Sequence, residues 1–527
     1  MLDKIKIPQV LSDAVQQRYI ELNGLRTLLI FSMAENHNYI IPKEKYDGLY
    51  SRYLKTFAEF SILSNKVETF LPQRIKEGIH WTLDFDDSSL YVEGITKKER
   101  EKRKKFKDDS YDEVMRKIYE SHPLYKDKKV MEVTFQVTED CTLACKYCYQ
   151  HNKSPKNMTL EVAKKYIDTI FKQYQDTHHC IILDFIGGEP LLQPQLISDI
   201  VDYWDYKCIM ENLHWGEITR FSLCTNGTQY RDPKVQKLLS KIDNRLSFTV
   251  SIDGNKELHD SARIFPNGKG SYDYAIDAAN DFETKHSIEL GSKMTIAPSN
   301  IIFLYPAIKH YLDTGAETIF ANCVYEEGWT YDDAKIFYKE LKKLTDYILE
   351  NYPNSYVSLF EEDSFEPMSE DDNQNWCGGN GVMLACDPDG VLYPCLRYMP
   401  SSIGDKQPAL TCGHIDTGGV DLNLMDEMQK ITRRSQSTDE CFYCPIARGC
   451  SWCTAYNYEV FGTINKRATF ICPMHKARAL ANVYYWNKYY RQKGYAKRKI
   501  NYCPKEWALE IIDENEWNML NNLALED

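Results

Sequence analysis

Between residue 130 and about residue 325, short runs rich in β-branched and aromatic residues alternate with helical stretches of about 15 to 30 residues. The six runs are VMEVTFQVT, CIILDFIGG, ITRFSLCTNG, RLSFTVSIDG, IELGSKMTIAP and AETIFANCV. Strands separated by helices in this way form parallel β-α units, and the loops at the carboxyl ends of such strands lie along one edge. This alternation predicts an α/β fold whose functional residues lie on those loops.

Three cysteines follow directly on the first of these runs. Cys141, Cys145 and Cys148 form a C-x3-C-x2-C pattern in the loop after EVTFQVTED. A structural zinc site closes with four ligands, and His151 keeps that alternative open. Three thiolates instead hold three irons of a cubane 4Fe-4S cluster and leave the fourth iron free for an external ligand. The spacing favours a cluster with an open iron.

Composition excludes several classes of partner and favours metal binding by the cysteines. The chain has 77 acidic and 64 basic residues and a net charge of -13, which gives no general footprint for nucleic acid or an anionic membrane. The N-terminus lacks a secretory pattern, and the longest apolar run, LRTLLIFSM, is far shorter than the ~20 residues that span a bilayer. We therefore expect a cytoplasmic protein whose cysteines, 17 in all, serve metal binding rather than disulfides. Cys180, Cys208, Cys224 and Cys323, which lie in or near the predicted strands, are instead expected to be small buried apolar residues.

The cysteine loop resembles that of the radical S-adenosylmethionine (SAM) enzymes. The resemblance rests on the C-x3-C-x2-C spacing, on Tyr147 and Tyr149 beside the last cysteine, and on the position after the first strand. It implies a partial (β/α)6 TIM-like barrel over residues 130–340. It also implies SAM on the open iron of the cluster, with cleavage of SAM to a 5'-deoxyadenosyl radical.

Three later loops match further motifs of these enzymes. The turn GGEP ends the second strand, TNG ends the third, SIDG ends the fourth, and an arginine follows in HDSARIF. By resemblance, the glycines let the backbone approach SAM, the glutamate accepts from its ammonium group, the polar residues surround its ribose and methionine parts, and the arginine pairs with its carboxylate. Each of these residues has an ordinary turn role as the alternative. The implied SAM contacts are Gly187, Gly188, Glu189, Pro190, Thr225, Asn226, Ser251, Asp253 and Arg263.

A second cysteine block resembles the SPASM extension of radical SAM peptide and protein maturases. Its pattern is C-x12-G-x4-C, then C-x2-C-x5-C-x2-C, then a single cysteine. The last short gap holds two residues, Ser451 and Trp452, where the family pattern has three. A zinc ribbon is the alternative interpretation. By resemblance, one auxiliary 4Fe-4S cluster is held by Cys441, Cys444, Cys450 and Cys472, and a second by Cys377, Cys395 and Cys453, with Cys386, Cys412 or an open iron in the fourth place.

The remaining segments complete the expected domain organisation. The runs HWTLDFD and SLYVEGI predict a β-hairpin around Trp81 and Val92, after a helical hairpin. This N-terminal part either binds a peptide leader by strand addition or serves in dimerisation or barrel capping. The expected parts are an N-terminal domain over 1–129, the barrel over 130–340, a linker over 341–375, the SPASM domain over 376–475 and a helical tail over 476–527.

The resemblance implies three 4Fe-4S clusters, SAM, a precursor peptide as substrate and an electron donor such as flavodoxin or ferredoxin. The expected reaction installs an intramolecular crosslink, with a thioether, as in the ranthipeptide and sactipeptide maturases, preferred over a carbon-carbon bond. One alternative is an anaerobic sulfatase-maturing enzyme that forms formylglycine. Another is a non-enzymatic electron carrier or zinc scaffold. The sequence singles out no catalytic acid or base and no oligomeric state.

Overall fold

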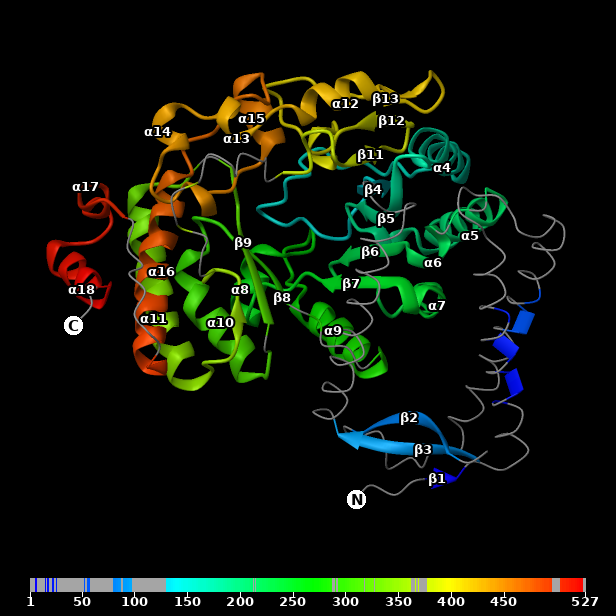
Figure 1. Ribbon diagram of the computed structural model, residues 1–527, viewed down its shortest axis with the longest axis horizontal. Helices are drawn as coiled ribbons and strands as arrows, with labels where there is room; N and C mark the ends of the chain where they lie inside the picture. The colour runs from blue at the N-terminus through cyan, green and yellow to red at the C-terminus, as the bar shows by residue number, and fades with distance from the viewer. Residues whose placement is uncertain are drawn as a thin grey trace. The chain divides into compact units, whose positions relative to one another are not determined.

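The computed structural model (Figure 1) divides into two compact units, Met1–Lys128 and Lys129–Asp527. Before residue 129 it describes residues 5–6, 79–86, 89–96 and a few single residues between 15 and 56. From there on it describes residues 129–211, 213, 215–286, 290, 292–316, 318–326, 328–361, 365, 368, 377–494 and 503–524.

The first unit contains a three-stranded antiparallel sheet. β2 (Ile79–Asp86) and β3 (Ser89–Thr96) pair along their whole length, and the short β1 (Ile5–Lys6) pairs with the other side of β3. The hairpin predicted from HWTLDFD and SLYVEGI is therefore present. The helical hairpin expected in the same unit lies almost entirely outside the described residues.

The second unit is built on parallel strands that follow one another in chain order. β4 (Lys129–Thr138), β5 (His178–Gly187), β6 (Arg220–Thr225) and β7 (Leu246–Val250) pair in parallel, as do β8 (Ser292–Ile296) and β9 (Thr318–Cys323). A single parallel bridge between Ser251 and Lys293 links the two sets. This confirms the predicted α/β fold with parallel strands. The helical segments between these strands are α4 (Leu160–Tyr174), η3 (Pro190–Leu192), α5 (Pro194–Met210), α6 (Trp215–Ile218), α7 (Pro233–Ile242), η4 (Asp243–Arg245), α8 (Lys256–Ala262), α9 (Tyr272–His286), η5 (Ile301–Phe303) and α10 (Leu304–Asp313).

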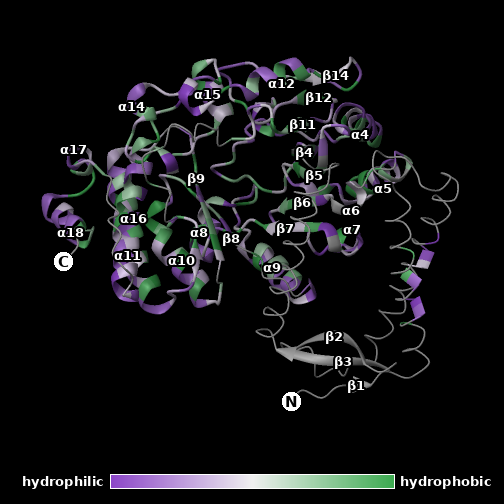
Figure 2. Ribbon diagram, in the orientation of Figure 1, coloured by the Kyte–Doolittle hydropathy of each residue, from purple (hydrophilic) through white to green (hydrophobic). Residues whose placement is uncertain are grey.

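Side-chain alternation explains how these strands are covered by helices. Along β4 the odd-numbered residues from Met131 to Val137 are almost fully buried. Phe135 packs edge-on against Tyr166 of α4, with ring centroids 4.7 Å apart. The helices around the sheet mix hydrophobic and hydrophilic residues, as amphipathic helices do (Figure 2). The apolar strand face thus meets the helices, whereas the opposite face carries polar residues such as Glu132, Thr134 and Gln136.

The cysteine-rich region continues the same sheet. β11 (Leu384–Cys386) pairs in parallel with β4, and antiparallel strands follow it outward to give an eight-stranded sheet. The other strands here are β10 (Tyr356–Val357) beside β9, and β12 (Val391–Tyr393), β13 (Gly413–His414) and β14 (Gly419–Val420) beyond β11. The helical segments are α11 (Tyr331–Asn351), η6 (Leu396–Tyr398), α12 (Leu422–Gln429), α13 (Arg433–Gln436), α14 (Asp439–Phe442), η7 (Ala447–Gly449), α15 (Thr454–Phe461), α16 (Cys472–Lys493), α17 (Lys505–Ala508) and α18 (Glu514–Ala524).

Helix α16 begins at Cys472, so the expected helical tail starts inside the cysteine-rich region. It packs along α11, and the two helices lie side by side in Figure 1. Within the described part of the chain, no helix combines the length and the apolar character that crossing a membrane requires.

Candidate functional site

The first cysteine loop lies immediately after β4 and is tied to a distant part of the chain. The amide of Ala144 donates to the carbonyl of Ile264 at 2.7 Å, and that of Lys146 donates to the carbonyl of Ala262 at 3.1 Å. Both acceptors lie at or just beyond the end of α8. Burial raises the pKa of the Cys141 thiol to about 11, although nearby Lys153 opposes the shift. The loop therefore holds three neighbouring thiols that a metal centre has to deprotonate.

The turn after β5 packs directly on this cysteine loop, and its glycines permit the approach. A Cβ on Gly188 would lie 2.2 Å from the carbonyl oxygen of Asp140 and 2.7 Å from the Cβ of Cys141. A Cβ on Gly187 would lie 2.4 Å from the carbonyl oxygen of Thr138. Real Cβ atoms do not come so close, so both positions require glycine in this arrangement. The predicted reason for these glycines was space for SAM, and the structure adds contact between the two loops.

Glu189 is fixed by donors from its own chain. Its side chain is 1% exposed and accepts from the hydroxyl of Thr225 at 2.6 Å, the amide of Asn226 at 2.8 Å and the amide of Leu191 at 3.1 Å. Burial raises its pKa to about 7, against the effect of these donors. The side chain of Asn226 also donates to the Thr142 hydroxyl at 3.1 Å. The loops after β4, β5 and β6 thus form one hydrogen-bonded unit.

Asp253 and Arg263 form a buried ion pair beside the cysteine loop. Arg263 Nε lies 2.8 Å from a carboxylate oxygen of Asp253, whose side chain is fully buried. The Tyr147 hydroxyl bonds the same carboxylate, and the guanidinium lies over the Tyr147 ring at 5.3 Å from its centroid. The structure therefore pairs Arg263 with a carboxylate of its own chain, whereas the sequence predicted the carboxylate of SAM.

Ser251 lies apart from this ion pair, on the polar face of the strands. Its hydroxyl is 3.5 Å from the sulfur of Cys224, and Lys293 Nζ is 3.8 Å from the same sulfur. Cys224 thus has polar neighbours, although its position in a strand suggested a small apolar core residue. Pro190 begins the short helix η3 that Glu189 caps.

Cys377, Cys395 and Cys453 are brought together in the second cysteine block. A Cβ on Gly379 would lie 3.1 Å from the sulfur of Cys395 and 3.4 Å from that of Cys377. Burial raises the pKa of Cys395, and the charges of Cys377 and Cys453 raise it further. Burial also raises the pKa of Cys453, and the neighbouring Cys377 raises it further, whereas Arg397 lowers it.

Arg397 connects this group to the first cysteine loop. Its guanidinium lies 4.7 Å from the ring centroid of Tyr149, the residue after Cys148, and 2.7 Å from the carboxylate of Glu326. Arg397 also forms a hydrogen bond with Cys453. Nothing in the sequence marks Arg397, because only the folded chain brings these segments together.

Cys386 and Cys412 border each other at a different place. Cys386 lies on β11 next to Ala385, and adjacent strand residues point to opposite faces. Ala385 packs with Cys395, whereas Cys386 and Cys412 belong to the main core beside Tyr166. The structure does not bring either thiol to Cys377, Cys395 and Cys453.

Cys441, Cys444, Cys450 and Cys472 form the other group. Burial raises the pKa of Cys472, and the neighbouring Cys450 and Cys441 raise it further, to about 12. Cys450 behaves differently. Burial raises its pKa, but His475 and Arg467 more than offset that effect and bring it to about 6. Cys503, which the sequence analysis did not assign, is buried near Cys444.

Buried positive charge fits an anionic cluster at this group. Arg467 is 8% exposed, and it donates to the carbonyl of Cys450 at 3.0 Å. Iron-sulfur clusters ligated by four thiolates carry net negative charge, which offsets the cost of burying a guanidinium. Among the described residues, no three His, Cys, Asp or Glu side chains are grouped as ligands of a single metal ion. In a cubane each cysteine binds a different iron atom.

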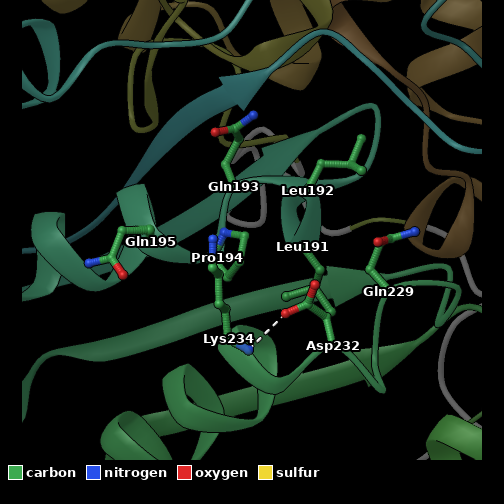
Figure 3. A pocket seen from close by; sticks show the side chains of 8 residues that line it. All are labelled: Leu191, Leu192, Gln193, Pro194, Gln195, Gln229, Asp232 and Lys234. Carbon is green, nitrogen blue, oxygen red and sulfur yellow. Dashed lines mark hydrogen bonds between the residues drawn. The ribbon is translucent and has the colours of Figure 1, made fainter.

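A surface hollow of about 240 Å³ lies next to the loops after β5 and β6. Figure 3 shows its lining, in which the backbone amide of Lys234 donates to the carboxylate of Asp232 at 2.7 Å. Leu191, Gln193 and Gln229 also line it, but none of the cysteines does. The hollow is therefore separate from the cysteine loop.

Comparisons with known proteins show what the chain is similar to. Residues 131–277 match the family described as a 4Fe-4S single cluster domain. The antilisterial bacteriocin subtilosin biosynthesis protein AlbA of Bacillus subtilis is 25% identical over 278 residues, which are 51% of this chain and 55% of AlbA. A cysteine-type anaerobic sulfatase-maturating enzyme of Clostridium novyi is 27% identical over 285 residues, which are 50% of this chain and 72% of that enzyme. The chain thus spans little more than half of AlbA.

A solved structure, that of native anSMEcpe with bound AdoMet, is similar to the chain in fold. The TM-score is 0.52 at 20% sequence identity, and the match covers 69% of this chain and 98% of anSMEcpe. This likeness supports the α/β fold with its parallel strands.

Proposed function

Because this chain belongs with the radical SAM maturases of the SPASM type, we propose that it modifies a peptide made on the ribosome by radical chemistry. The product that we propose is an intramolecular crosslink, with a thioether preferred over a carbon-carbon bond. One observation carries the proposal: three loops from different strand ends join Cys141, Gly188, Glu189 and Asn226 into a single hydrogen-bonded unit.

The chain's own residues fit the cofactors of such an enzyme. In our proposal Cys141, Cys145 and Cys148 hold the cluster that binds SAM, on a partial (β/α)6 barrel formed by β4 to β9. When bound, the cluster and SAM supply the 5'-deoxyadenosyl radical. Gly187 and Gly188 keep the loops in contact, Glu189 presents a buried carboxylate toward the ammonium group of SAM, and Arg263 with Asp253 fixes Tyr147 beside the cysteines.

Two auxiliary clusters complete the proposed set of three. Cys441, Cys444, Cys450 and Cys472 supply four ligands for one, and Cys377, Cys395 and Cys453 supply three for the other. The placement of Cys386 and Cys412 favours a fourth ligand from outside this set, such as a substrate thiolate. Forming a bond by removing hydrogen leaves excess electrons, and these clusters offer them a route.

The partners that we propose are a precursor peptide and a cytoplasmic electron donor such as flavodoxin or ferredoxin. AlbA, by its name, takes part in the biosynthesis of the bacteriocin subtilosin. In the first unit, β2 pairs with β3 on one side, and no other described strand pairs with it. Such an edge can accept an extended leader peptide by strand addition.

A second candidate function is sulfatase maturation, favoured by the similarity to the Clostridium novyi enzyme. A thioether and a formylglycine made from serine each remove two hydrogens, so intact mass does not separate those two products, whereas a formylglycine made from cysteine also exchanges sulfur for the oxygen of water, releases hydrogen sulfide and is separated by intact mass. Formylglycine formation converts one side chain, whereas a thioether joins two residues, resists alkylation of the cysteine and suppresses fragmentation between them.

Anaerobic incubation with SAM and dithionite tests the proposal. We expect release of 5'-deoxyadenosine by the wild-type protein and none by the variant Cys145→Ala. Adding cysteine-bearing peptides encoded next to the gene then tests the crosslink by mass spectrometry after alkylation. Full iron loading without any 5'-deoxyadenosine would contradict the proposed enzyme and favour an electron carrier.

A further inference from the structure

Two buried arginines face one tryptophan inside the second cysteine block. The guanidinium of Arg467 lies 4.3 Å from the ring centroid of Trp452, and that of Arg433 lies 5.7 Å from it. Trp452 and Ser451 are the two residues between the ligand candidates Cys450 and Cys453. All three side chains are nearly inaccessible, with 8%, 3% and 3% of Arg467, Arg433 and Trp452 exposed.

Arg467 is directed at the group of four cysteines. It donates to the Cys450 carbonyl at 3.0 Å, and Cys444, Cys450 and Cys472 all lie within reach of its charge. Within the part of the chain that the structure describes, Arg467 forms no ion pair with an Asp or Glu. Among the residues that the structure describes, no carboxylate therefore offsets its charge, which acts on the cysteine group at short range in a medium of low dielectric.

Arg397, beside the other cysteine group, is in a different situation. It is paired with Glu326 at 2.7 Å, so its positive charge is offset by a carboxylate. The two cysteine groups thus lie in different electrostatic fields, one with an uncompensated buried guanidinium and one with an ion pair.

We infer that Arg467, held against Trp452, raises the reduction potential of the cluster on Cys441, Cys444, Cys450 and Cys472. Reduction adds one electron to a centre that is already negative, and a nearby fixed cation stabilises the reduced state more than the oxidised state. Arg467 is then a residue that tunes the cluster rather than a ligand. The inference rests on the cluster assignment proposed above but not on SAM cleavage.

A redox titration monitored by electron paramagnetic resonance tests this directly. The titration uses full-length protein in which Cys141, Cys145 and Cys148 are replaced by alanine, so that only auxiliary clusters contribute. Arg467→Gln removes the charge, and Arg467→Lys keeps it. Arg434→Gln is the matched control, because Arg434 is exposed and already paired with Asp439 at 2.5 Å. Iron and sulfide are measured for every variant.

We expect two auxiliary signals with different potentials in the parent protein. Arg467→Gln should move one of them to a more negative potential, whereas Arg467→Lys and Arg434→Gln should leave both close to the parent values. An unchanged potential in Arg467→Gln at full iron content would overturn the inference. If Arg467→Gln loses a cluster, retention of iron and potential in Arg467→Lys supports a role of charge, and loss in both variants overturns it. These results do not depend on 5'-deoxyadenosine, so they stand or fall separately from the enzymatic proposal.

Discussion

At the scale of single residues, Gly188 shows how steric contact governs the site. A methyl group there would lie 2.2 Å from the Asp140 carbonyl oxygen, which is backbone and cannot rotate away. We expect Gly188→Ala to displace the cysteine loop and to reduce 5'-deoxyadenosine release at least tenfold. The cost of such overpacking is about 1–3 kcal/mol. Gly268→Ala is the control, because Gly268 has open space around its Cβ position, so an alanine there meets no neighbouring atom and costs only the strain of its positive φ. Equal effects of both changes would contradict a steric role for Gly188.

Glu189 gives a pH dependence of stability with a defined sign. Its pKa of about 7 in the folded chain lies above the ordinary 4.5, so the folded state holds the proton more tightly than the unfolded chain. The free energy of unfolding that this group contributes, about 3 kcal/mol at most, is fully present below pH 4.5 and is lost as the pH rises through 7.

Denaturant unfolding of the SAM-free protein between pH 5 and 8 checks the effect of Glu189. Relative to Glu189→Gln, the wild type should lose unfolding free energy as the pH rises. Glu132→Gln is a useful comparison, since burial raises the pKa of Glu132 to about 7 as well. A wild type and a Glu189→Gln variant that respond identically to pH would exclude the buried carboxyl as the cause.

At the scale of elements, the two faces of β11 lead to opposite predictions for two cysteines, Cys386 on one face and Cys395 packed against the other. Cys386 points into the main core with Cys412, whereas Cys395 lies beside Cys377 and Gly379. We expect Cys386→Ala to keep full iron content and to lose about 1 kcal/mol of stability from a small cavity. Cys395→Ala should lose the iron of one cluster. Iron and sulfide analysis of both variants after anaerobic purification tests these expectations. Loss of a cluster in Cys386→Ala would show that Cys386 is the fourth ligand.

The elements that the sequence predicts well are those with a repeating local pattern. The strands from EVTFQVTED to AETIFANCV and the hairpin around Trp81 were readable because side-chain alternation follows from strand geometry. The pairing of β11 with β4 was not predicted. It involves three residues from strands more than 240 positions apart, and no local pattern records such a partner.

The candidate site divides in the same way between local and long-range information. The cysteine spacings and the GGEP turn are local patterns, and each marks residues that the structure groups together. Arg397 and Arg467 carry no local signal, because their roles come from contacts with Tyr149, Trp452 and the cysteines made only after folding. Arg263 and Asp253 were both recognised in the sequence, but the ion pair between them was not, because it forms only after folding.

At the scale of the whole molecule, one continuous sheet relates the cysteine loop to the later cysteine block. β11 extends the sheet from β4, the strand that leads into Cys141, and Arg397 reaches from Cys453 to Tyr149. The first loop and the later block are therefore parts of one compact unit.

This arrangement predicts the iron content of the assembled protein. Three cubane clusters contain about twelve iron atoms per chain. Replacing Cys141, Cys145 and Cys148 together by alanine should remove about four, and replacing Cys441, Cys444, Cys450 and Cys472 should remove about four in an independent way, because the two sets use separate ligands. The measurement is iron and acid-labile sulfide per chain after anaerobic reconstitution, with Cys208→Ala as a control in a core cysteine outside both sets. A wild type with fewer than about eight irons per chain would contradict three clusters. If each variant also lost the iron of the other set, the two groups would have to assemble together.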